Sequence, residues 1–210
     1  MTAGERDPTV FVVDDDEAVR ASLRLLLKSL GIRAITNSSA AEFLAEYDPE
    51  HPGCIILDVR MPGMSGLELQ DELNRRGAII PVIFITGHGD VPMAVEAMQH
   101  GAVDFLQKPF SDKDLTNRIQ QALSIDLRNR ALLGEKEIMR ARLAALTPRE
   151  IQVLRLVTLG KSNKVIAGDL DLSQRTVELH RAHLMEKMGA SSLAHLVRMT
   201  MIEDLDISTH

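Results

Sequence analysis

The sequence predicts a doubly wound α/β domain built on a five-stranded parallel sheet, followed by a small all-α domain. Up to about residue 125, five short apolar runs alternate with segments whose apolar residues recur at helical spacing. From Thr147 onward only helical spacing is present. The charge divides in the same place: residues 1–127 hold 20 Asp and Glu against 11 Lys and Arg, a net −9, whereas residues 128–210 hold 10 against 13, a net +3.

Each expected strand is a short apolar run that ends at a polar residue. Continuous apolar runs are typical of strands buried on both faces, and their alternation with helices favours a parallel sheet. The second run is weak, because only Ala34 and Ile35 form it. The five expected strands are residues 10–13, 34–35, 54–57, 82–85 and 104–107.

Helical spacing, caps and glycine stops predict the helices between these strands. Apolar residues recur from Val19 to Leu30, and Gly31 ends that helix. Ser39 caps the next helix, which ends at Tyr47. Further helices are expected after the loop of residues 61–66, over residues 91–100 after the loop of residues 87–90, and from residue 111 or 112.

Residues 126–145 are expected to form a helical linker between two domains, predicted at residues 8–125 and 146–203. The segment is charged, its apolar residues are at helical spacing, and Gly134 interrupts it. Two interpretations stay open: a bent or flexible helical linker, or a simple extension of the preceding helix.

The all-α domain is predicted to begin at Thr147, with Pro148 at the first helical position and Glu150 at the third. A helix over 162–169, a turn capped by Ser173 and a longer helix over 175–188 follow, and then a helix over 191–202. The first two of these have helix-turn-helix spacing, in which the second helix lies in the major groove of DNA. A four-helix dimerisation or interaction module with solvated Lys and Arg is the alternative.

Polar side chains stand at the carboxyl ends of four expected strands: Asp14, Asp15 and Asp16, then Asp58, Thr86 and Lys108. With strand order 2-1-3-4-5 these ends are neighbours, so the side chains should converge in one crevice. Crowded carboxylates repel one another, and a hard cation such as Mg²⁺ with oxygen ligands relieves that repulsion.

A carboxylate beside a cation, an ammonium group and a hydroxyl is equipped to attack phosphorus and become an acyl phosphate. Lys108 would neutralise charge on the phosphoryl oxygens, and the Thr86 hydroxyl would hydrogen-bond one of them. The sequence has neither a P-loop nor a kinase-type glycine loop, so the phosphoryl donor is expected to be another protein or a small phosphodonor.

Composition limits the cellular location and the kinds of site that this protein can have. No apolar stretch approaches the roughly 20 residues of a membrane span and the start is polar, so a cytoplasmic protein without a membrane partner is expected. The one cysteine, Cys54, excludes an intramolecular disulfide framework and a multi-thiolate zinc site. With no Trp, one Tyr and five Phe, a stacking platform for single-stranded nucleic acid is not expected.

The polar strand ends and their flanks resemble the receiver domain of bacterial response regulators, over about residues 8–125. The segments that carry the resemblance are Val12-Val13-Asp14-Asp15, Leu57-Asp58-Val59-Arg60-Met61-Pro62, Ile85-Thr86 and Lys108-Pro109-Phe110. The resemblance implies a flavodoxin-like fold. It also implies that Asp58 accepts a phosphoryl group from a sensor histidine kinase.

The same resemblance implies the other residues of the site. Asp15 and Asp58 would ligate Mg²⁺ together with the backbone carbonyl of Arg60, and Asp14 would act mostly through water. Lys108 would contact the phosphoryl group, and Thr86 and Phe105 would form a switch pair. Many relatives have Tyr where Phe105 stands. The Lys108–Pro109 peptide would be cis, which proline tolerates.

The basic half resembles the LuxR/NarL-type DNA-binding domain, over about residues 145–202. The segments are Leu146-Thr147-Pro148-Arg149-Glu150, residues 163–167 (Asn-Lys-Val-Ile-Ala) and residues 175–181 (Arg-Thr-Val-Glu-Leu-His-Arg). By this likeness Thr176, Glu178, His180 and Arg181 face the groove and backbone, and Lys164, Arg175, Lys187 and Ser192 contact phosphates. Many relatives have Lys where Glu178 stands; a carboxylate there would accept from cytosine N4 or orient Arg181.

The pairing of these two halves, with residues 87–95 between them, is similar to the FixJ subfamily of response regulators. The resemblance implies a transcription factor rather than an enzyme. Phosphorylation of Asp58 would drive homodimerisation through residues 91–100 and the fifth strand, and the dimer would bind double-stranded promoter DNA and act with RNA polymerase.

Two other classes stay open from the residues themselves. Mg²⁺-dependent phosphatases with an aspartate nucleophile typically have a second Asp two residues further on, where this chain has Arg60. A signalling adaptor would bind protein through the helical half, and its binding would lack the steep salt dependence of DNA binding.

Overall fold

The computed structural model describes residues 6–87 and 91–201, and the chain divides into two compact units between Arg130 and Ala131. Within the described residues no helix is both long and apolar enough to cross a membrane.

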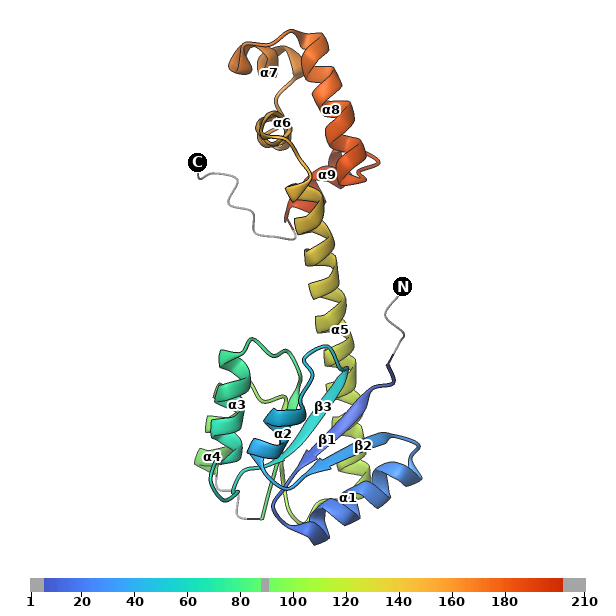
Figure 1. Cartoon of the computed structure of the whole chain (residues 1–210), viewed down its shortest axis with the longest axis vertical. Coiled ribbons are helices and arrows are strands. Elements are labelled where there is room, and N and C mark those ends of the chain that lie inside the picture. The colour runs from blue at the N-terminus through green and yellow to red at the C-terminus, as the bar shows by residue number, and fades with distance from the viewer. Residues whose placement is uncertain (1–5, 88–90, 202–210) are drawn as a thin grey trace. The chain divides into compact units, whose positions relative to one another are not determined.

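The first unit is built on a five-stranded parallel sheet of order β2-β1-β3-β4-β5, as predicted (Figure 1). The weak second run is a full strand in register with β1, Thr9 beside Arg33 through Val13 beside Asn37. The strands are β1 (Thr9–Val13), β2 (Arg33–Asn37), β3 (Gly53–Asp58), β4 (Val82–Thr86) and β5 (Asp104–Gln107).

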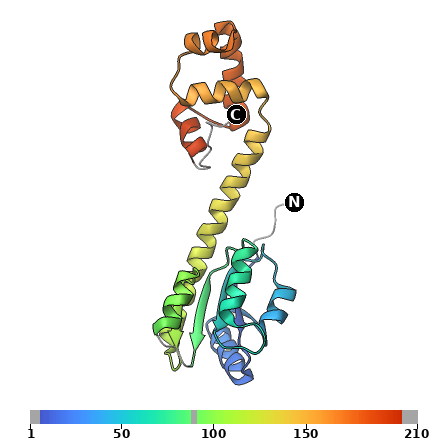
Figure 2. The same ribbon diagram turned by 90° about the vertical axis from the view of Figure 1, so that its left-hand side faces the viewer.

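Helices cover both faces of the sheet, which confirms the doubly wound prediction (Figures 1 and 2). One face of the sheet packs against α2 and α3 through Phe43, Leu69 and Leu73. The other packs against α1 and the first part of α5 through Leu27 and Ile119. The helices of this unit are α1 (Glu17–Ser29), α2 (Ala40–Glu46), α3 (Gly66–Arg75), α4 (Val91–Gln99) and the first part of α5 (Asp112–Ala144). Of the predicted loop 87–90, residues 88–90 lie outside the described residues.

Strand residues alternate between these two faces. Phe11 and Val13 point into one core and Val10 and Val12 into the other, as the period of two in a strand requires. The residues that directly precede Asp14, Asp58 and Thr86 are Val13, Leu57 and Ile85, and all three are fully buried, so the core anchors these strand ends.

Local capping places the loops that follow β1 and β3. Asp16 caps α1 by accepting from the backbone N–H of Ala18, and Ser65 forms a capping box with Glu68 at the start of α3. Gly66 lies against β3: a Cβ at this position would stand 2.3 Å from the backbone oxygen of Asp58. Only glycine therefore allows α3 to begin this close to Asp58.

The fifth helix is continuous from Asp112 to Ala144, so residues 126–144 extend it and Gly134 does not break it. The first unit also reaches further along this helix than the predicted limit of 125. Asp126 accepts from the backbone N–H of Gly53 at 2.9 Å, and Arg130 donates to the backbone oxygens of Pro49 and His51. These contacts hold the helix to the loop before β3 as far as Arg130.

The second unit is all-α, and its helices follow the prediction closely. Thr147 caps the first helix with the expected Pro148 and a capping box to Glu150, and Ser162 and Ser173 cap the next two. The helices are α6 (Pro148–Thr158), α7 (Asn163–Leu170), α8 (Gln174–Met188) and α9 (Leu193–Met201). The last starts after the predicted residue 191, and Ile202 lies outside the described residues.

The core of the second unit lies between these helices and the end of α5. Val153, Ile166, Val177 and Leu184 are fully buried there, and Met139 of α5 packs with them. The turn between α7 and α8 passes through Asp171, whose φ of 52° is a left-handed conformation that Asp tolerates better than most residues. The pair α7 and α8 therefore has helix-turn-helix form.

Candidate functional site

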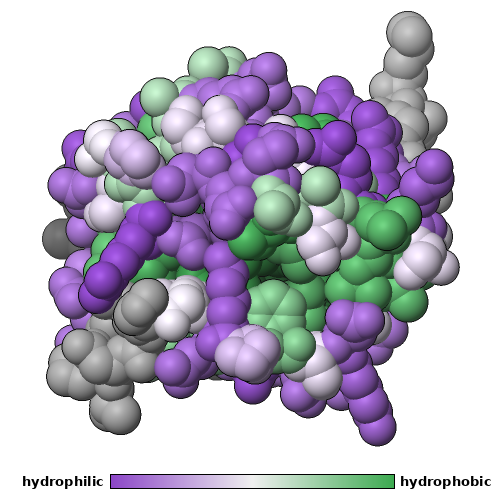
Figure 3. Space-filling model, turned by 90° about the horizontal axis from the view of Figure 1, so that it is seen from below, coloured by the Kyte–Doolittle hydropathy of each residue, from purple (hydrophilic) through white to green (hydrophobic). Residues whose placement is uncertain are grey.

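Four predicted site residues meet at the carboxyl end of the sheet. Asp14 directly follows β1, Asp58 and Thr86 are the last residues of β3 and β4, and Lys108 directly follows β5. Since β1, β3, β4 and β5 are successive neighbours, their ends lie side by side. Figure 3 views this end of the first unit, where hydrophilic residues cover most of the surface and hydrophobic residues surround a hollow.

The Lys108 ammonium lies between two carboxylates. Its Nζ is 2.9 Å from Asp14 Oδ2 and 3.2 Å from Asp58 Oδ1. Asp14 is only 1% exposed and Asp58 only 7%. Two largely buried negative charges thus share one positive charge, and the cluster has a net charge of −1 when all three groups are ionised.

Backbone groups orient both carboxylates. Asp14 Oδ1 accepts from the N–H of Asp16 at 2.9 Å, and Asp58 Oδ2 accepts from the N–H of Arg60 at 2.8 Å. The side chain of Arg20 donates to the backbone oxygen of Asp14. These bonds leave Lys108 facing one oxygen of each carboxylate.

Two backbone features position Lys108. Its N–H donates to the backbone oxygen of Thr86 at 2.8 Å, which extends the pairing of β5 with β4. The Lys108–Pro109 peptide bond is cis, which confirms the sequence prediction.

The protonation equilibria reflect this crowding. Burial raises the pKa of the Asp58 carboxyl, and the nearby Lys108 charge and the Arg60 N–H only partly offset that effect. For Lys108, burial favours the neutral amine, but the hydrogen bond and charge of Asp14, with those of Asp58, outweigh burial and raise its pKa. Lys108 therefore remains an ammonium group at neutral pH.

The donor set at this end suits Mg²⁺. Asp14, Asp15, Asp58 and the carbonyl of Arg60 are all hard oxygen donors, and Mg²⁺ typically takes one or two carboxylates and keeps several waters. Asp15 is exposed, and Asp16 caps α1. Among the residues that the structure describes, no group of three or more His, Cys, Asp or Glu side chains is arranged to hold a metal ion. A site here would therefore rest on two carboxylates with a carbonyl and water.

Thr86 and Phe105, the predicted switch pair, are on the neighbouring strands β4 and β5. Thr86 is buried at the end of β4, and Phe105 is partly buried on β5, where it packs against the core that contains Phe84. Phe84 and Phe105 are register partners across β4 and β5.

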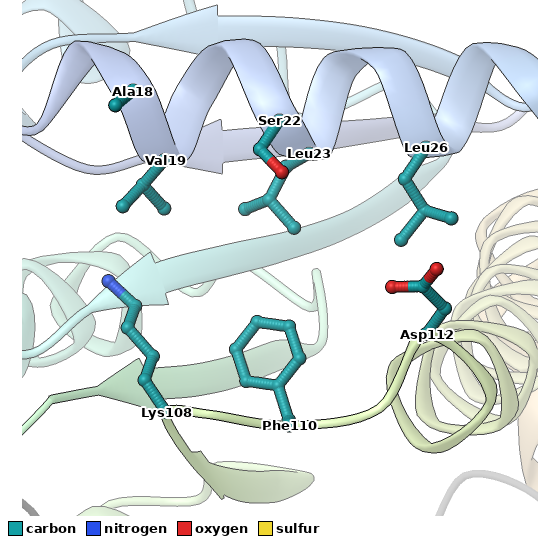
Figure 4. A pocket seen from close by; sticks show the side chains of 8 residues that line it. All are labelled: Ala18, Val19, Ser22, Leu23, Leu26, Lys108, Phe110 and Asp112. Carbon is teal, nitrogen blue, oxygen red and sulfur yellow. The ribbon is translucent and has the colours of Figure 1, made fainter.

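A recess of about 300 Å³ adjoins Lys108. Figure 4 shows the Phe110 ring pointing toward α1, with Lys108 and Asp112 on either side of it. Val19, Leu23 and Leu26 form the opposite wall. The cluster of charged residues therefore borders an apolar depression between α1 and the start of α5.

In the second unit, several predicted DNA-contacting residues are exposed on α7 and α8. Lys164, Arg175 and Glu178 are exposed, and Thr176 and His180 are partly buried. The hydroxyl groups of Thr176 and Ser173 are hydrogen-bonded to one another at the start of α8.

Three predicted contacts also have partners within the unit. Arg181 donates to Asn163 Oδ1 at 2.7 Å, so Asn163 orients it; the described residues show no ion pair between Arg181 and Glu178. Ser192 accepts from the N–H of His195 at the start of α9. Lys187 is 2.7 Å from Glu150 Oε2, and Glu150 is only 3% exposed.

Two features of this unit were not predicted from the sequence. Glu150 forms the predicted capping box, but the same carboxylate also binds Lys187. Leu179 is a large apolar side chain exposed on α8 between Arg175 and His183. The signal for Leu179 was available, because its position is on the face of α8 opposite the buried Val177.

Comparison with known proteins agrees with this geometry. Residues 10–120 match the response regulator receiver domain, and residues 144–200 match the bacterial regulatory proteins of the luxR family. The chain therefore belongs to the response regulators that join a receiver domain to a LuxR-type DNA-binding domain. Members of this family regulate transcription in two-component systems and are not enzymes that turn over a substrate.

Within the family, the chain belongs with the FixJ-type regulators. It is 51% identical over 197 residues to the transcriptional regulatory protein FixJ of Azorhizobium caulinodans, which covers 92% of each chain. It is 45% identical over 201 residues to nodulation protein W of Bradyrhizobium diazoefficiens, with 96% of this chain and 88% of that protein covered. The solved structure of the response regulator StyR matches with a TM-score of 0.85 at 46% identity, over 93% of this chain and 98% of that one.

Proposed function

We propose that Asp58 is the phosphoacceptor of this regulator and that its acyl phosphate controls DNA binding by the second unit. The observation that carries the proposal is the position of Lys108, within hydrogen-bond distance of both Asp14 and Asp58. This position lets the Asp58 carboxylate become an acyl phosphate while the Lys108 ammonium neutralises charge on the phosphoryl oxygens.

In the proposed transfer, an Asp58 carboxylate oxygen forms a bond to phosphorus while the P–N bond of the kinase phosphohistidine breaks. The leaving imidazole nitrogen keeps the electron pair of that bond and can then take a proton from solvent. The Lys108 ammonium then pairs with a phosphoryl oxygen, and the Thr86 hydroxyl donates a hydrogen bond to another.

Receiver domains generally use Mg²⁺ for this reaction. We propose that Asp15 and Asp58 would hold the ion with the backbone carbonyl of Arg60, and that Asp14 would hold one of its waters. When bound, Mg²⁺ would supply charge neutralisation on the phosphoryl oxygens. The all-oxygen donor set and the net negative charge around Lys108 support this assignment.

The switch would follow from the rearrangement around the acyl phosphate. Thr86 would move toward the phosphoryl oxygens, and the Phe105 ring would pack into the space that Thr86 leaves. Thr86 ends β4, and Phe105 is on the neighbouring β5. Together α4 and β5 form one face of the unit, on which Val95 and Met98 of α4 are exposed. This apolar surface supports phosphorylation-dependent homodimerisation through α4 and β5.

The dimer would place two α8 helices about one turn of DNA apart on promoter DNA and would act with RNA polymerase. Lys164, Arg175, Lys187 and Ser192 would contact phosphates. Thr176, Glu178, His180 and Arg181 would face the groove and backbone, with Glu178 accepting from cytosine N4. Leu179 adds an apolar contact suited to a thymine methyl group.

A gel-shift titration with an acyl-phosphate donor and Mg²⁺ tests the proposal. We expect apparent DNA affinity of the full chain to rise by about ten- to a hundredfold on phosphorylation, because a dimer presents both recognition helices at once. Asp58→Ala should bind DNA as the unphosphorylated protein does, with or without the donor. A response of Asp58→Ala equal to that of the unaltered chain would place the phosphoacceptor elsewhere.

A further inference from the structure

One face of α5 presents a regular stripe of small and apolar residues, most of which are exposed. Leu127, Ala131, Gly134, Ile138 and Ala141 recur at alternating spacings of four and three, which places them on one side of the helix. We call these five residues the α5 stripe. Leu127 is 73% exposed and Ile138 is 56% exposed, unlike the core residues of either unit.

Among the described residues, none explains why a glycine stands at position 134, at the centre of the stripe. It is inside a continuous helix, where glycine is less favourable than alanine. A Cβ built on Gly134 would meet nothing within 4 Å, so no neighbour in the described part of the chain requires a residue without a side chain. A missing side chain on an exposed helix face does allow a second helix to approach the backbone closely.

Charged residues on either side of the stripe indicate that the partner helix is α5 of a second copy of this chain. Arg130 and Glu137 flank one edge, and Glu135 and Arg142 flank the other. In a parallel pair of identical helices, each residue of the first edge faces the residue five positions later on the other edge of the second copy. Arg130 then faces Glu135, and Glu137 faces Arg142, so every such pair joins opposite charges.

These charged residues keep their contacts within the chain. Arg142 uses Nη1 to bind the backbone oxygen of Met188, and Arg130 binds Asp126 and the backbone oxygens before β3. A guanidinium group has five N–H donors, so both arginines have capacity for a further acceptor.

We propose that in the phosphorylated dimer the α5 stripe pairs in parallel with the α5 stripe of a second copy of this chain. The inference rests on the proposed phosphorylation-dependent dimer and adds a second contact to it. The stripe spans only about two heptads, which is too short to hold two chains together unaided. It pairs once the receiver domains dimerise and raise the effective concentration of one α5 beside the other.

Cysteine cross-linking of the full chain tests this. Gly134→Cys and Ala141→Cys each put a thiol on the stripe, and Lys136→Cys is the matched control on the opposite side of the same helix. With acyl-phosphate donor and Mg²⁺ under mild oxidation, we expect both stripe variants to form disulfide-linked dimers at least about tenfold faster than Lys136→Cys. The chain without an added cysteine gives the background, because Cys54 is buried.

Sedimentation of the same samples separates the two proposals. A phosphorylated dimer without preferential cross-linking at residues 134 and 141 overturns the stripe pairing and leaves the proposed function standing. Equal cross-linking at residue 136 also overturns it. Absence of any dimer on phosphorylation refutes the proposed dimerisation, and the stripe pairing with it.

Charge reversal gives an independent readout. Glu137→Arg places like charges opposite Arg142 of the second copy, and we expect the dimer dissociation constant to rise by roughly three- to tenfold with phosphorylation unchanged. Lys136→Glu, which alters charge off the stripe, should leave the constant unchanged. If Glu137→Arg dimerises like the unaltered chain, the parallel register is wrong.

Discussion

Lys108 in the first unit and Lys187 in the second each contact a buried carboxylate, and their surroundings differ by one charge. Lys108 bridges two acids, Asp14 and Asp58, whereas Lys187 pairs with Glu150 alone. The 1:1 pair is neutral and joins α6 to α8. The cluster of Lys108 with Asp14 and Asp58 keeps one excess negative charge, so it is suited to bind a cation.

The largest expected effect is on the rate of phosphorylation, which should depend on Lys108 and not on Lys187. Lys108→Met removes the charge that would stabilise the transferring phosphoryl group, and we expect the rate of phosphorylation to fall by about 100-fold or more. Incorporation from an acyl-phosphate donor, followed by phosphate-affinity electrophoresis, measures it. Lys113→Met changes an exposed lysine of α5 and is the control. A rate for Lys108→Met near that of the control would show that the cluster does not act on phosphate.

Lys187→Met should affect stability and leave phosphorylation unchanged. It leaves Glu150 buried without its ion pair, and we expect the free energy of unfolding of the second unit to fall by about 2 kcal/mol. Calorimetry of the full chain should show the transition of the second unit lowered by about 10 °C and that of the first unit unmoved. An unchanged Tm would mean that the capping box alone satisfies Glu150.

The pH dependence of the same pair sharpens the comparison. The hydrogen bond from Lys187, followed by that from the Thr147 backbone, lowers the pKa of Glu150 from 4.5 to about 2. A carboxyl whose pKa is lower in the folded state stabilises fully above its unfolded pKa and loses that contribution as pH falls toward the folded pKa. The Tm difference between the unaltered chain and Glu150→Gln should therefore be constant from pH 7 to about 5.5 and shrink toward pH 3. A difference at pH 3 as large as that at pH 7 would point to a shape effect of the substitution.

The smallest expected effect concerns an exposed pair in the same unit. Lys161 and Asp169 are 2.7 Å apart, with about two fifths of each side chain exposed. Solvent screening makes such a pair weak, so Lys161→Met should change the free energy of unfolding by less than about 0.5 kcal/mol. Chemical denaturation measures it, and a loss as large as that of Lys187→Met would show that burial does not decide which ion pairs matter here.

The sequence predicted the sheet, its order and the meeting of Asp58 with Lys108, because apolar runs locate strands and parallel strands align their carboxyl ends. It could not show that Lys187 binds Glu150, because the two residues are 37 positions apart and a basic residue on a recognition helix is equally typical of a phosphate contact. Whether Gly134 would bend α5 also stayed open, since one glycine costs only about 1 kcal/mol in a helix. The extension of the first unit to Arg130 depends on side-chain bonds to Gly53, Pro49 and His51 that no periodicity reveals.

Gly66 has a consequence for how this regulator tolerates change. The position carries no side chain and takes no part in the proposed chemistry, yet any larger residue would push against the peptide oxygen of Asp58. In a saturation library selected for signalling, residue 66 should be as intolerant as the phosphoacceptor itself. The difference is that its variants would fail by displacing the reactive group, so their defects should vary with side-chain volume and not with charge.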